Sequence, residues 1–177
     1  MKKKTLALVL ALTLLVAGVV GGTLAWLTDR TAEVKNTFTV GDINIDLTET
    51  TANYKMVPGN TIAKDPTVTV KANSEACWLF VKVTESANLG DYITYNIADG
   101  WTALAGVDGV YYREVGAVTN DVDFLVLKDN IVTVKDTVTK AMLETAKTNA
   151  PTLTFKAYAV QKGNVASASD AWAKVNP

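Results

Sequence analysis

The chain has 177 residues, with 17 Lys and Arg against 18 Asp and Glu, and it contains no histidine. This length suits one domain of ordinary size with a short segment in front of it. Basic residues cluster only at Lys2, Lys3 and Lys4, so the rest of the chain lacks the positive surface that neutralises phosphates, and we exclude nucleic acid as a partner. The lack of histidine removes the commonest general base and the commonest metal ligand.

Residues 1–25 have the three parts of an export signal. The three lysines form its basic start, residues 6–20 form an apolar run, and Thr23 and Ala25 place small residues where a signal peptidase needs them. We therefore predict cleavage between Ala25 and Trp26 and a secreted protein. The alternative is a retained membrane helix, but glycines interrupt the run and its apolar part is short for a bilayer core of about 30 Å. Cleavage there removes the three lysines and no acidic residue, so the net charge changes from −1 to −4.

Cys77 is the only cysteine, so the chain cannot form an intrachain disulfide although an extracellular compartment would permit one. Alternation in residues 76–83 groups Cys77 with Leu79 and Val81 on one strand face. This pattern predicts a buried, unreactive thiol. An intermolecular disulfide is the alternative.

The rest of the sequence has the period of two that is typical of strands, and it is rich in Val, Ile, Thr, Phe and Tyr. Turn signals such as Val57-Pro58-Gly59-Asn60 and Asp129-Asn130 separate the runs by about eight to twelve residues. We predict an all-β, jelly-roll-like sandwich of two packed antiparallel sheets. The expected strands are residues 37–40, 43–47, 67–71, 78–84, 92–97, 101–104, 110–115, 121–127, 131–134 and 153–159, with 37–40 paired to 43–47 and the pair 67–71 and 78–84 at the sheet centre.

One or two short helices interrupt this pattern. Asp136 is the expected N-cap of a helix over residues 137–147, in which apolar side chains recur four apart. Ser169 or Asp170 is the expected cap of a last helical turn that carries Trp172.

The carboxylates offer the one remaining route to catalysis. Asp42 with Asp46, and Asp121 with Asp123, have the spacing that places two acids on one strand face. Such pairs are commonly solvated, with calcium binding as an alternative. The chain has no HExxH motif and no phosphate-binding glycine loop. We assign no catalytic, cofactor or metal residues.

Four aromatic residues raise the question of sugar binding. A platform of Trp78, Trp101, Tyr111 and Tyr112 would suit a sugar ring, but aromatic residues at strand spacing more often fill a core.

Two blocks of sequence resemble a known family. Residues 21–47, GGTLAWLTDRTAEVKNTFTVGDINIDL, are similar to the exit of a SipW-type signal peptide joined to the first strands of the TasA and camelysin family. Residues 57–65, VPGNTIAKD, resemble that family's Pro-Gly turn and the Lys-Asp step after it. The resemblance covers residues 18–85; beyond them it is loose, with 155–161 and the terminal Ala171-Trp172 similar to the ends of camelysin-like members.

This resemblance implies a secreted jelly-roll subunit of biofilm-matrix fibres in Gram-positive bacteria. Residues 26–36 would form an N-terminal arm that adds as a strand to the next subunit, and 37–177 the β-sandwich domain. Trp26, Leu27 and Val34 are the expected arm contacts, and the acceptor is not identifiable from sequence. The implied partners are further copies in a head-to-tail homopolymer, an accessory matrix protein and the signal peptidase, with membrane contact only through an uncleaved signal.

Three alternatives remain open. The arm folds back on its own domain, which would also cover Trp26 and Leu27. Camelysin is classed as a metalloprotease, although a chain without histidine would need an atypical carboxylate site. A monomeric surface adhesin or sugar-binding module is the third.

Overall fold

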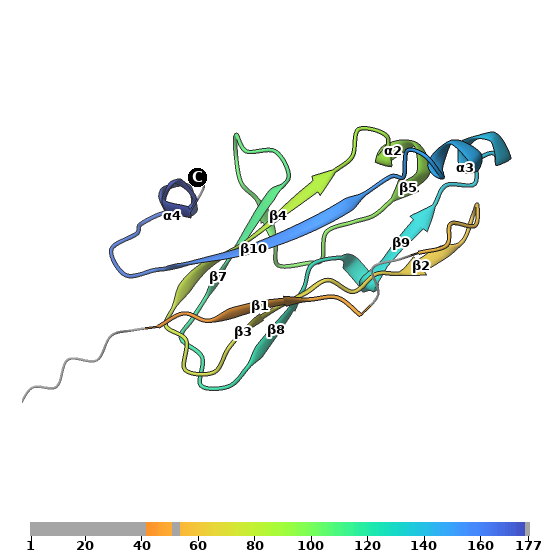
Figure 1. Ribbon diagram of the computed structural model, residues 1–177. Coiled ribbons are helices and arrows are strands. Elements are labelled where there is room, and N and C mark those ends of the chain that lie inside the picture. The colour runs from red at the N-terminus through yellow and green to blue at the C-terminus, as the bar shows by residue number, and fades with distance from the viewer. Residues whose placement is uncertain (1–41, 51–53, 176–177) are drawn as a thin grey trace, which may run out of the picture. The chain divides into compact units, whose positions relative to one another are not determined.

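A computed structural model describes residues 42–50 and 54–175 (Figure 1). The predicted signal, its cleavage site, the N-terminal arm and the strand at 37–40 therefore lie outside the described residues. No helix in the described part of the chain is long and apolar enough to span a membrane. The elements in chain order are β1 (Ile45–Thr48), β2 (Thr61–Ala63), β3 (Thr67–Val70), β4 (Cys77–Glu85), α2 (Leu89–Tyr92), β5 (Ile93–Thr94), β6 (Thr102–Ala103), β7 (Val110–Val115), β8 (Val122–Leu125), η1 (Lys128–Asn130), β9 (Ile131–Val134), α3 (Lys140–Ala146), β10 (Leu153–Gln161) and α4 (Ala168–Val175).

The predicted all-β antiparallel fold is confirmed, but hydrogen bonding divides the strands into three sheets instead of two. Their strand orders are β1-β3-β8, β10-β4-β7-β6 and β2-β9-β5, and every pairing is antiparallel. Two short connections join the first sheet to the third. One leads from β2 to β3 and the other from β8 to β9.

The main core lies between β3 and β4. Alternation turns Val68 and Val70 of β3 toward Cys77, Leu79 and Val81 of β4, and all five side chains are fully buried. The expectation that these two strands pair at the centre of one sheet is wrong, because each lies in its own sheet. The chain turns between them and crosses from one layer to the other instead of closing a hairpin.

The turns that the sequence predicted are formed. Asn60 N–H donates to the Val57 carbonyl (3.1 Å) and Gly59 has φ +78°, the positive value that a type II turn requires. Asp129 and Asn130 also have positive φ, of 57° and 54°, immediately before β9.

A second core covers the outer face of the four-stranded sheet. Trp78 and Phe80 alternate away from the main core and pack under α4, where Trp172 is 5% exposed. The cap of this helix is Ser167, whose Oγ accepts from Asp170 N–H (3.1 Å), and not Ser169 or Asp170 as expected. The helix therefore begins before the predicted caps.

The third core lies between the β2-β9-β5 sheet and α3. Two expectations are wrong here. The helix begins at Lys140 with Thr139 as N-cap, whose Oγ1 accepts from Met142 N–H (3.3 Å), while Asp136 lies in the turn before it. The predicted strand at 92–97 is instead the end of α2 and the short β5, because Leu89 and Tyr92 are both buried at helical spacing.

Candidate functional site

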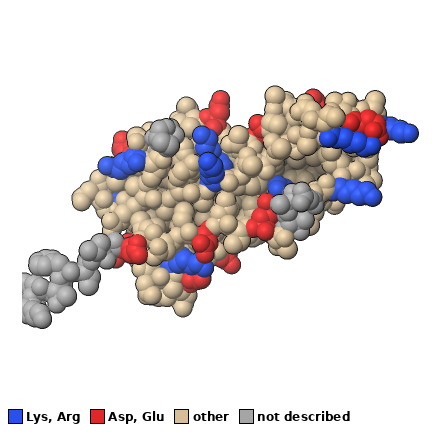
Figure 2. Space-filling model, in the orientation of Figure 1, with Lys and Arg blue, Asp and Glu red and all other residues tan. Residues whose placement is uncertain are grey.

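The candidate site is an apolar groove of about 700 Å³ bordered by the ends of β1 and β10. This volume falls in the range of about 300–1,000 Å³ that is typical of ligand sites. The surface of the molecule is hollowed on this side (Figure 2). Its main apolar walls are Leu47, Met56, Ile62, Leu89, Val132 and Phe155.

Both bordering strands present an edge that no other described strand covers. Among the described residues, β1 pairs only with β3, and β10 pairs only with β4. The two strands lie close together on the same side of the sandwich (Figure 1). Their outer edges carry backbone N–H and C=O groups that another strand can bind.

The β10 edge is long and its inward side chains become small. The strand has nine residues, of which Phe155, Ala157 and Ala159 point toward the main core. Tyr158 and Val160 point to the opposite face, under α4. The groove reaches this strand at its first three residues, Leu153, Thr154 and Phe155.

Lys64 brings a charge into the apolar wall of the groove. Alternation after β2 turns Lys64 inward with Ile62, and only 7% of Lys64 is exposed. Its Nζ donates to Glu49 Oε1 at 2.6 Å. The same ammonium lies 4.8 Å from the centre of the Tyr54 ring and 5.4 Å from that of Phe155.

Tyr54 completes this polar cluster. Its hydroxyl donates to Glu49 Oε1 at 2.8 Å. Burial, followed by this hydrogen bond and the negative charge of Glu49, raises the pKa of the Tyr54 hydroxyl. The hydroxyl is therefore a donor at neutral pH, and the Glu49 carboxylate accepts from both Tyr54 and Lys64.

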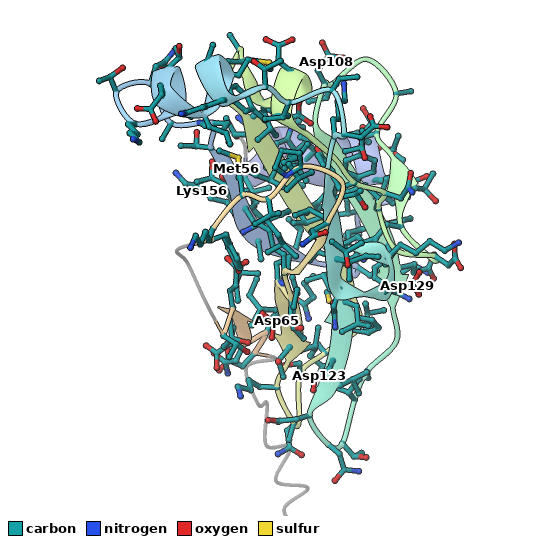
Figure 3. All side chains as sticks on the ribbon, turned by 90° about the vertical axis from the view of Figure 1, so that its right-hand side faces the viewer. Met56, Asp65, Asp108, Asp123, Asp129 and Lys156 are labelled. Atoms are coloured by element: carbon teal, nitrogen blue, oxygen red, sulfur yellow. The ribbon has the colours of Figure 1, made fainter. Side chains whose placement is uncertain are left out.

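The two members of each acidic pair considered from sequence bind different groups, and one member of each pair lies beside Lys71. Asp46 and Asp121 each lie 3.1 Å from Lys71 Nζ, and Asp123 accepts from the Thr69 hydroxyl. Asp42 accepts from Asn44 Nδ2 and from a neighbouring backbone N–H. The labelled acids Asp108, Asp123 and Asp129 stand apart (Figure 3). Within residues 42–50 and 54–175, no three acidic or thiol side chains are placed to hold a metal ion.

The four aromatic residues considered as a sugar platform do not share one surface. Trp78 and Tyr112 pack in the core under α4, whereas Trp101 and Tyr111 pack toward the main core. The guanidinium of Arg113 lies 5.3 Å from the centre of the Trp101 ring. A platform built from all four is therefore not formed.

Sequence reasoning did not single out Lys64, Glu49 or Tyr54 as site residues. Alternation carries a signal for Lys64, since Ile62, Lys64 and Pro66 share one face. Glu49 and Phe155 are far from Lys64 in sequence, so no local pattern brings the three together.

Comparison of the chain with protein-family models, with curated proteins and with solved structures finds no match. A function for this protein is therefore inferred from the groove, the two strand edges and the sequence.

Proposed function

We propose that the protein is a secreted structural subunit of extracellular fibres, in a biofilm matrix or at the cell surface. In this proposal the N-terminal arm, residues 26–36, leaves its own domain and adds as a strand to the next copy. The observation that supports it is the apolar groove beside the free edges of β1 and β10.

Strand addition requires unpaired backbone N–H and C=O groups at a sheet edge, with side-chain pockets next to that edge. The guest backbone gains hydrogen bonds from an open edge, while alternate guest side chains enter pockets beside that edge. The β10 edge offers nine residues, the length of the segment from Trp26 to Val34. Burial of the Trp26 and Leu27 side chains contributes on the order of 3 to 5 kcal/mol before ordering costs.

The test compares two chains, one beginning at Trp26 and one beginning at Lys35, by sedimentation velocity and electron microscopy over a range of concentrations. We expect only the longer chain to form fibres, because only it carries the arm. Two monomeric samples would contradict unaided assembly, and assembly of both chains would contradict the role of the arm.

The protease alternative has a direct test. Purified protein is incubated with casein, with and without a chelator. We expect no cleavage, and chelator-sensitive cleavage would overturn the structural role.

A further inference from the structure

Lys64 is the chemically distinctive residue of the groove. Its side chain is almost fully buried, and its ammonium carries three N–H donors. Among the described residues the one hydrogen-bond acceptor of Nζ is Glu49 Oε1, and the other near neighbours are the rings of Tyr54 and Phe155. The ammonium therefore retains N–H donors that no oxygen in residues 42–50 and 54–175 accepts.

A guest in the groove changes the surroundings of this cation. Filling the groove removes water from its walls, and a buried charge is costly unless it is paired and hydrogen-bonded. The Glu49 oxygen that faces Lys64 is already shared with the Tyr54 hydroxyl. Lys64 is already paired with Glu49, but its remaining N–H donors lose their water when the groove is filled. A guest carboxylate accepts from these donors, whereas a wholly apolar guest leaves them without an acceptor.

The N-terminal arm has such a carboxylate. In an extended segment Leu27 and Asp29 point to the same face, about 7 Å apart. This spacing places one apolar side chain and one negative charge on the face that enters the groove. Glu33 lies on the same face but about 13 Å further along, too far to bind the same ammonium.

We propose that Lys64 selects the guest strand by charge: the groove takes the arm of a second copy, with Leu27 in its apolar part and the Asp29 carboxylate bound to Lys64 Nζ. This inference rests on the proposed function and specifies its partner and register. Lys64 thus acts as the specificity-determining residue of the acceptor, which disfavours an arm shifted by one residue because that shift turns Asp29 away.

The test uses the chain beginning at Trp26 and measures the concentration at which fibres form. We expect Asp29→Asn and Lys64→Gln each to raise this concentration by about 30-fold, as loss of one partner of a desolvated charge pair does. Glu33→Gln is the matched control, with an expected change below about threefold. The combined Asp29→Asn and Lys64→Gln chain is expected to be little worse than either single variant, because the two residues share one interaction.

The outcomes separate this inference from the proposed function. Failure of the parent chain to assemble would overturn both. Normal assembly of the Asp29→Asn chain, or equal losses in the Asp29→Asn and Glu33→Gln chains, would overturn the role of Lys64 and leave fibre formation intact. Urea unfolding of the Lys64→Gln chain controls for damage to the acceptor, and the Asp29→Asn variant decides the matter alone if Lys64→Gln unfolds.

Discussion

Gly109 and Val83 are in direct backbone contact. Val83 N–H donates to the Gly109 carbonyl at 2.7 Å, and a Cβ on Gly109 would overlap the Val83 carbonyl oxygen. Gly109 also has φ +69°, a conformation that favours glycine. The β6–β7 turn therefore lies so close to β4 that only glycine fits at position 109.

The Gly109→Ala change is expected to lower the free energy of unfolding by about 2 kcal/mol or more, because it adds a backbone clash to the cost of positive φ. Urea unfolding measures this loss. Gly106→Ala is the matched control, since Gly106 has φ +77° in the same turn but open space around its Cβ position. Equal losses for both variants would show that the contact with Val83 is not the cause.

The Trp172→Ala change is expected to destabilise the protein by about 3–5 kcal/mol, since it empties the core under α4. The Trp172 ring centre lies 5.3 Å from that of Phe80 and 5.2 Å from that of Tyr158. Thermal or urea unfolding measures the effect. Lys174→Ala, on the exposed side of the same helix, is expected to change stability by less than about 0.5 kcal/mol.

Cys77 is expected to resist thiol reagents in the folded protein. Its side chain is fully buried, and this burial raises the pKa of the thiol to about 11. At pH 8 about one thiol in a thousand is then ionised, and the reagent has no access to it. Labelling is measured in buffer and in concentrated urea, and fast labelling in buffer would contradict the buried position.

The Asp121 carboxylate is expected to stabilise the fold at pH values above the ordinary pKa of an aspartate, and to stabilise it less at lower pH. A hydrogen bond from Ala72 N–H (2.8 Å), and then one from Lys71, lower the pKa of the Asp121 carboxyl below 3.8. A lowered carboxyl pKa favours folding at higher pH, and this contribution disappears as the pH falls through the folded-state pKa.

Asp121→Asn should therefore flatten the loss of stability between about pH 5 and pH 2. Urea unfolding at several pH values measures the slope. Asp108→Asn, at an exposed position in the β6–β7 loop, serves as the control. An unchanged slope in the Asp121→Asn chain would contradict the assignment.

Alternation predicted strands well where one face is buried. The bounds of β7 and β9 are those expected, and β4 differs by one residue at each end. Alternation reveals which side chains share a face but not which strand lies alongside, so the placement of β3 and β4 in different sheets was not foreseen. Helix starts were misplaced because several polar residues near each start can act as a cap.

The groove was beyond prediction for a related reason. Glu49, Lys64 and Phe155 come from three distant parts of the chain, and only the packed layers bring them together. The arm residues, in contrast, can be picked out from the sequence, because Trp26, Leu27 and Asp29 lie within four residues of one another.

The pairing of β4 with β10 joins two segments that are far apart in sequence. The central strand at Cys77–Glu85 finds this neighbour only at Leu153–Gln161, and α4 follows later still. Contacts so distant in sequence form slowly, and these cannot form before residues 153–161 have been made. One edge of the central strand β4 therefore stays uncovered until β10 is made, and in that interval it is open to pairing with another chain.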